Sequence, residues 1–258
     1  MFSILFVLIS RTPLFFLKAI SFFFYISARI LKVSHLNITK KNIDHCFGDN
    51  KELVNRSFRE TLELSLIFPF IWGKKDNYKK LIDPDYLQNK SLENDRPKMF
   101  FTLHMGCVDI LIFVLSELLA QVNFLYTPVK NKKLERKLID IRQRQGGKMF
   151  PATPNGVKNL YKSFIDKKNI VIASDLVPHK QGVYEKFFNR ECFCIDLVEK
   201  LSNKGTHDLH FIYLTKGKKN KYKLVCKKIK NKITTSEMNA LFEDCLLYTS
   251  PSPRDDEL

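Results

Sequence analysis

From residue 98 onward, apolar and polar positions follow two different periods along the chain. Short apolar runs bounded by polar or turn residues predict buried strands, and longer segments with apolar residues every three or four positions predict helices. We expect strands at 98–103, 122–127, 169–174, 210–215 and 221–227. We expect helices near 109–120, 132–144, 155–167 and 192–204. This alternation predicts an α/β domain with a mixed, largely parallel central sheet flanked by helices.

The amino-terminal segment has a different pattern, in which residues 2–9 and 14–28 are apolar apart from Lys18. Basic residues follow this apolar stretch at Arg29, Lys32, Lys40 and Lys41. A secretory signal carries its charge before the apolar stretch, whereas basic residues after it favour a cytoplasmic location for the remainder. We therefore expect residues 1–30 to be a membrane-anchor helix that spans at a tilt or lies in the interface. The alternative is the buried helical hairpin of a soluble protein.

The chain of 258 residues is long enough for one sizeable domain with its own core, which we expect over residues 31–244. The composition changes abruptly after that, from a segment rich in Lys, Asn and Ile to a Ser-Pro stretch. Residues 245–258 resemble a translated sequencing adapter. We expect them to be a non-native tail that packs poorly and has no function, attached to a truncated gene.

A formal net charge of +16 requires an explanation. It suits nucleic acid, an anionic membrane surface or an acidic protein partner, and an AT-rich genome is a further explanation. No RNP, KH or zinc pattern accompanies the basic segments, so we do not expect nucleic acid to be the partner. The six cysteines have no paired C-x2-C spacing, which predicts reduced thiols and no metal site.

Candidate chemistry lies first in the run that contains His104 and Asp109. A helix turns through about 100° per residue, so a single continuous helix would not place these two side chains on one face. A histidine at the end of a strand and a carboxylate at the start of the next helix can meet across the intervening loop. Asp109 would then fix the tautomer of His104 and stabilise its imidazolium form. A chance match with a structural role is the alternative for so short a motif.

Three other polar residues are also candidates for the site. Arg142 and Arg144 precede Gly146-Gly147, near the end of a predicted helix, and guanidinium groups there can hold phosphate through two hydrogen bonds. A solvated helix face is the alternative for these cations. Asp175 ends a predicted buried strand, which is a frequent place for a functional carboxylate and equally a place for a turn or helix cap.

In order and spacing, these features resemble the lipid A biosynthesis acyltransferase family, the lauroyl and myristoyl transferases of Gram-negative bacteria. The resemblance covers the apolar anchor, His104-x4-Asp109, Tyr126-x-Pro-Val-Lys-Asn131, residues 134–147 and Gly182-Val-x-x-x-Phe-Phe188. The chain has Gly106-Cys-Val-Asp109 where many members have Gly-Asn-Trp-Glu, and Thr127 where an Arg is common.

The resemblance implies acyl transfer from acyl carrier protein to a glycolipid acceptor, a lipid A precursor, at the cytoplasmic face of the bacterial inner membrane. It implies His104 as general base with Asp109, and Arg142, Arg144 and Asp175 as substrate-binding or supporting residues, with no cofactor. Two other readings remain open. One is an acyltransferase that acts on another glycolipid or on a glycerophospholipid. The other is a membrane-tethered binding protein without enzymatic activity.

Overall fold

The computed structural model describes residues 2–31, 33–88, 92, 95–178, 181–217, 221–230 and 232–249, and only the backbone of 2–5 and 248–249. The chain divides into two compact units. One comprises Met1–Asn77 together with Glu243–Leu258, and the other comprises Tyr78–Phe242.

The first unit is built from helices, and α2 is its most apolar long helix. The helices are α1 (Phe2–Arg11), α2 (Leu14–Ile30), α3 (Ser34–Phe47) and α4 (Lys51–Gly73). One side of α2 packs against α4, where Leu17, Ser21 and Tyr25 are buried and the ring of Tyr25 lies 6.3 Å from that of Phe58. Asn50 precedes helix α4, and its side chain caps the helix by accepting a hydrogen bond from the backbone N–H of Leu53.

The opposite side of α2 exposes large apolar side chains, namely Phe15, Phe16, Ile20, Phe22, Phe23, Phe24, Ile26 and Ile30. In the described part of the chain, no single helix is long and apolar enough to cross a bilayer. Helices α2 and α3 meet the length and composition criteria only as a pair, with a bend of 87° between them.

The second unit contains a six-stranded sheet in the order β3-β2-β4-β1-β7-β8. Its strands are β1 (Lys98–Thr102), β2 (Asn123–Tyr126), β3 (Lys148–Pro151), β4 (Ile170–Ala173), β7 (Asp208–Lys216) and β8 (Tyr222–Lys228). All neighbouring pairs are parallel except β7 and β8. The prediction of a mixed, largely parallel sheet is confirmed.

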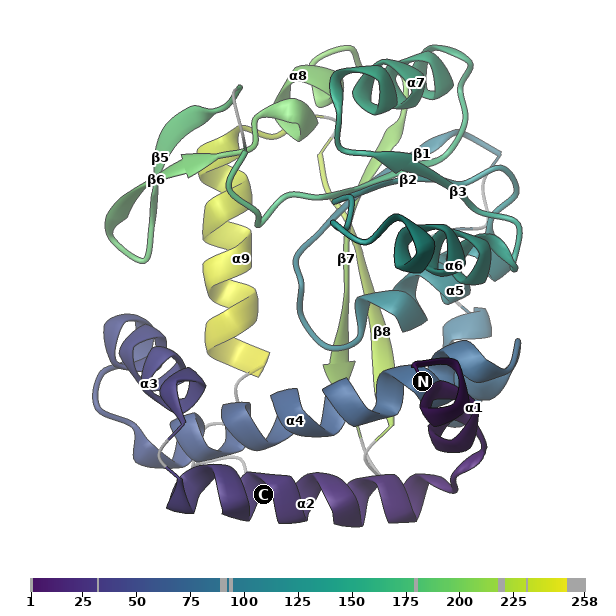
Figure 1. Ribbon diagram of the computed structural model, residues 1–258. Helices are drawn as coiled ribbons and strands as arrows, with labels where there is room; N and C mark the ends of the chain where they lie inside the picture. Colours follow the sequence, from purple (N-terminus) through teal and green to yellow (C-terminus); the bar gives the residue numbers. More distant parts are fainter. Residues whose placement is uncertain are drawn as a thin grey trace. The chain divides into compact units, whose positions relative to one another are not determined.

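Helices and short turns flank this sheet (Figure 1). They are η1 (Asn77–Lys80), η2 (Pro84–Gln88), α5 (Val108–Leu118), α6 (Lys132–Gln143), α7 (Pro154–Ile165), α8 (Leu197–Ser202) and α9 (Thr235–Thr249). The core consists mainly of the fully buried strand β1, the first three residues of β4, the first seven residues of β7 and the apolar helix α5. The ring of Phe242 in α9 lies against those of Phe101 and Phe211, at 6.1 and 5.5 Å.

One prediction about local structure is wrong. The helix expected at 192–204 is replaced at its start by strand β6 (Arg190–Cys194), which pairs with β5 (Val183–Phe187) in a separate hairpin, and only α8 is helical. The hairpin turns at Phe188 and Asn189, whose φ angles of 46° and 60° match a tight two-residue turn. Of the tail expected at residues 245–258, Cys245 lies in α9 and is buried, whereas Leu247 is 45% exposed. Residues 250–258 lie outside the described part, so the expectation for the tail as a whole stays a prediction.

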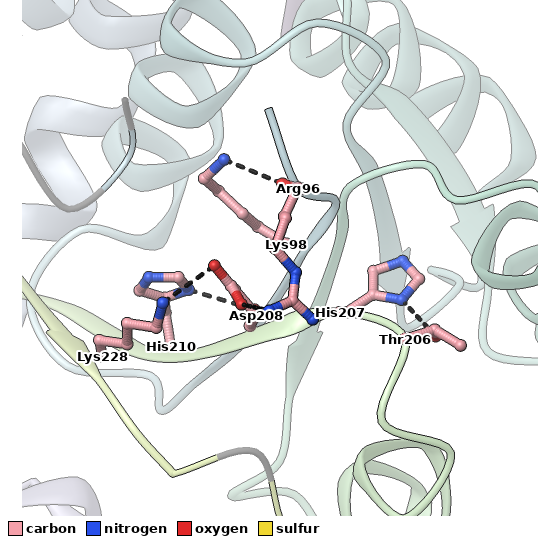
Figure 2. A network of polar contacts seen from close by, with 7 residues as sticks. All are labelled: Arg96, Lys98, Thr206, His207, Asp208, His210 and Lys228. Carbon is pink, nitrogen blue, oxygen red and sulfur yellow. Dashed lines mark hydrogen bonds and ion pairs between the residues drawn. The ribbon is translucent and has the colours of Figure 1, made fainter. Parts of the chain in front are cut away.

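A buried carboxylate at the start of β7 anchors the amino end of the sheet (Figure 2). Asp208 is fully buried and lies 3.2 Å from Nη1 of Arg96 and 3.0 Å from Nζ of Lys228. Nδ1 of His210 lies 3.2 Å from the backbone oxygen of Asp208, and burial lowers the pKa of both His210 and Lys98. A buried carboxylate requires such partners, so this network joins the ends of β7 and β8 to the segment before β1.

Candidate active site

His104 and Asp175 lie side by side at the carboxyl edge of the sheet, just after the ends of β1 and β4. The two strands are adjacent and parallel, with Thr102 paired with Ala173. His104 and Asp175 each follow two residues after these positions, so the register of the sheet brings them together. The backbone N–H of Ser174 still donates to the carbonyl of Thr102, at 3.0 Å, which keeps the chains in register beyond the strands.

Asp175 holds His104 through both of its carboxylate oxygens. Oδ1 of Asp175 lies 2.8 Å from Nδ1 of the ring, and Oδ2 accepts a hydrogen bond from the backbone N–H of His104 at 2.7 Å. The hydrogen bond to Asp175 raises the pKa of His104 above its usual value of 6.5, although burial opposes this effect. With its proton on Nδ1, the imidazole presents Nε2 as the atom that can accept a proton. The side chain is 44% exposed, so a substrate can reach it.

The carboxylate expected to orient His104 has a different partner. Asp109, the second residue of α5, is 2% exposed, and its Oδ1 accepts a hydrogen bond from Nε of Arg142 at 2.6 Å. A buried carboxylate is stable only beside an opposite charge, and Arg142, in the last turn of α6, supplies it. The expected bond from Asp109 to Nδ1 of His104 is therefore corrected, because the sheet register gives this position to Asp175.

The loop between His104 and α5 depends on Gly106. Its φ angle is +66°, and a Cβ at this position would lie 3.0 Å from the carbonyl oxygen of Leu214. Cys107 follows and is fully buried, and burial raises the pKa of its thiol to about 12. It remains protonated at neutral pH, so Cys107 is not a suitable acyl-accepting nucleophile.

Helix α6 positions the two arginines beside α5. The side chain of Asn131 caps its start by accepting from the backbone N–H groups of Lys133 and Leu134. At its other end, the guanidinium group of Arg144 lies 4.6 Å from the ring centroid of Phe113, a cation–π contact. The segment after α6 can pass close to α5 only because residue 147 is a glycine. A Cβ at Gly147 would lie 2.3 Å from Oγ of Ser116 in α5.

Four of the candidate residues thus form two neighbouring pairs, whereas the sequence predicted a single pair of His104 with Asp109. His104 pairs with Asp175, Asp109 pairs with Arg142, and the charges of Asp109 and Arg142 both act on the pKa of His104. Arg144 lies at the edge of this group, on Phe113. Sequence reasoning named all five residues but assigned Asp175 only a supporting place. The signal it lacked was the adjacency of β1 and β4, which lie far apart in sequence.

The fold and the site define an α/β protein that presents a histidine–carboxylate pair at the carboxyl edge of a parallel sheet. The chain belongs to the bacterial lipid A biosynthesis acyltransferase family, whose model matches residues 1–245. The resemblance identified from the sequence is thereby confirmed, and the protein is an acyltransferase of lipid A biosynthesis. No curated protein gives a significant match.

Proposed function

We propose that the protein transfers a fatty acyl chain from acyl carrier protein to a hydroxyl group of a lipid A precursor, with His104 as general base. The observation that carries this proposal is the pairing of His104 with Asp175, with Nε2 on an accessible side chain. A general base must be neutral before the reaction and must be held in one orientation. Asp175 provides the orientation through two hydrogen bonds to the same residue.

The reaction proceeds in two proton transfers around one acyl transfer. Nε2 of His104 removes the proton of the acceptor hydroxyl while its oxygen attacks the carbonyl carbon of the thioester. The resulting tetrahedral intermediate collapses, the carbon–sulfur bond breaks, and the carrier thiolate takes the proton back from His104. Asp175 stabilises the imidazolium that exists between these steps, as the acid of a catalytic triad does.

Arg142 and Arg144 are proposed to bind the phosphate groups of the acceptor. Asp109 holds Nε of Arg142, so the two terminal nitrogens of the guanidinium group remain available to hold an anion. This arrangement gives Asp109 a positioning role through Arg142 and not through the histidine. Phosphate bound there would lie close to the acceptor hydroxyl without taking part in proton transfer.

The membrane is the proposed location of the reaction, at the cytoplasmic face of the inner membrane. The exposed aromatic side of α2 suits the boundary between headgroups and acyl chains, while its other side stays on α4. Acyl carrier protein is acidic and the membrane is anionic, so a net charge of +16 favours both partners.

The catalytic part is tested by acyl transfer from radiolabelled acyl carrier protein with purified His104→Ala protein. We expect activity to fall to background with an unchanged circular dichroism spectrum, because no other group in the site replaces Nε2. His35→Ala, which removes an exposed histidine at the start of α3, is the matched control and should retain full activity. Transfer by folded His104→Ala at the wild-type rate would refute the mechanism.

Membrane attachment is tested separately with Phe15→Ser/Phe23→Ser. Both side chains are more than 60% exposed, at 63% and 69%, so the fold should tolerate the change. We expect the variant to move from the membrane pellet to the supernatant at high salt, where the electrostatic contribution is screened. Leu87→Ser, at 58% exposed and in η2, is the control. A double variant that still sediments with membranes would contradict attachment through α2.

A further inference from the structure

A cleft at the amino ends of β2, β3 and β4 has a surplus of positive charge. Its volume is about 350 Å³, and it lies between these strand ends and the carboxyl-terminal half of α7. Its lining includes Lys148, Phe150, Asn159, Lys162, Asp166 and Lys168. Three of the lining residues are therefore lysines, and one is an aspartate.

The three lysines have no acidic partner among the described residues, since no ion pair joins Lys148, Lys162 or Lys168 to a carboxylate there. The neighbouring cluster of Figure 2 differs, because Arg96 and Lys228 both approach the buried carboxylate of Asp208. Like charges that share a cleft repel one another, and a bound anion relieves that repulsion. The surplus therefore indicates a ligand and not an internal network.

The cleft is separate from the His104 site. His104 follows the carboxyl end of β1, whereas Lys148 begins β3 and Lys168 directly precedes β4. The strands between the two edges contain four or five residues, about 13–17 Å at the rise of a strand. A ligand in the cleft therefore does not occupy the place of the acyl group or its acceptor hydroxyl.

We propose that this cleft binds a small ligand that carries phosphate with two or more negative charges. Lysine ammonium groups are compact point charges suited to phosphate, and the amide of Asn159 adds hydrogen-bond donors. The partly exposed ring of Phe150 supplies an apolar wall. A hollow of this size lies within the range of small-molecule sites, about 300–1,000 Å³, which favours a small group over the surface of a protein partner. The phosphate belongs to a soluble compound or to a lipid headgroup.

Calorimetric titration of the purified protein with pyrophosphate tests the proposal without any activity measurement. We expect saturable binding that weakens at least about tenfold in Lys148→Gln/Lys162→Gln/Lys168→Gln, a change of about 1.4 kcal/mol. Asp166→Asn should bind more tightly, because it removes the only carboxylate of the cleft lining. Lys158→Gln removes a charge from the same helix outside the lining and is the matched control.

Flotation with phosphatidylcholine vesicles, with and without phosphatidic acid, separates the two sources of phosphate. Binding to phosphatidic acid that the triple variant loses assigns the cleft to a lipid headgroup. If the wild type binds pyrophosphate, and the wild type and the triple variant float equally with phosphatidic acid vesicles, the cleft is assigned to a soluble ligand. The proposal is overturned if the wild type binds neither probe. It is also overturned if the triple variant binds pyrophosphate as the wild type does, or if Lys158→Gln loses as much affinity as the triple variant.

Discussion

The two edges of the central sheet use carboxylates in opposite ways. At the amino edge, Asp208 is fully buried between the cations of Arg96 and Lys228 (Figure 2). At the carboxyl edge, Asp175 is partly exposed and bonded to a histidine that is 44% exposed. The first arrangement neutralises charge within the protein. The second leaves a ring nitrogen that can exchange a proton with a substrate.

Asp109 shares one property with each of these two carboxylates. It is as buried as a structural carboxylate, yet its partner Arg142 belongs to the candidate site. Fixing a cation by burying its partner is a way to orient it before a ligand arrives, which lowers the entropic cost of binding. The comparison teaches that burial alone does not separate structural from functional carboxylates. The partner groups differ instead: Asp208 contacts two cations outside the candidate site, Asp109 contacts an arginine of that site, and Asp175 contacts a histidine that can exchange a proton.

The largest expected effect is at Asp175. Asp175→Asn should lower kcat by about 10⁴, as in a catalytic triad without its acid, because the amide favours the wrong tautomer of His104. Steady-state transfer kinetics measure this, and Asp140→Asn, on an exposed part of α6, is the control. If Asp175→Asn retains more than about a tenth of the activity, the bond to His104 has no catalytic importance.

Asp208→Asn should damage stability and not chemistry. Removing one partner of a buried ion pair costs about 3–5 kcal/mol because the remaining charges lose their compensation. Urea unfolding should show this loss, whereas kcat per folded molecule stays at the wild-type value. Asp140→Asn should change stability by less than about 0.5 kcal/mol. A stable Asp208→Asn protein with a low kcat would contradict the purely structural role of Asp208.

Arg142→Lys should have an intermediate effect. Arginine can donate from Nε to Asp109 and hold an anion with its two terminal nitrogens, whereas lysine keeps the charge but has one nitrogen for both partners. We expect kcat/KM to fall about 10- to 100-fold, mostly through KM, because this change weakens acceptor binding. Arg136→Lys is an exposed control on the same helix. A fall confined to kcat would assign Arg142 to the chemical step and not to acceptor binding.

The smallest expected effect is on the pH dependence of stability. The pKa of His104 is higher in the folded protein than its ordinary value of 6.5. The stabilisation from its protonated form is therefore complete below pH 6.5 and is lost as the pH rises through the folded pKa. The difference in thermal unfolding between wild type and His104→Gln should be largest below pH 6.5 and should shrink as the pH rises through the folded pKa of His104. Equal divergence at high pH would contradict the ion pair.

The sequence predicted much of the fold and named the site residues, but not their pairing. Strand β1 and helix α5 follow directly from local periodicity, and Gly146-Gly147 marks the end of α6. Asp175 was recognised as a strand-end residue. Its bond to His104 depends on β4 lying beside β1, and local patterns contain no information on strand order.

The β5–β6 hairpin was missed for a related reason. Its turn places Phe188 at a positive φ, a conformation that phenylalanine rarely adopts and that turn rules do not assign to it. The apolar residues of Arg190–Cys194 then fit a helical pattern as well as a strand, and only the pairing with Val183–Phe187 decides between them.

The pH dependence of kcat/KM tests the central claim most directly, namely that Asp175 orients and charges His104. The free enzyme should lose activity as the pH falls through the raised pKa of His104, because the protonated ring cannot act as a base. In Asp175→Asn, whose residual activity is followed in the same way, this acid limb should move to lower pH, and by more than in Asp109→Asn. An acid limb that stays in place in Asp175→Asn, or that moves further in Asp109→Asn, would contradict the account.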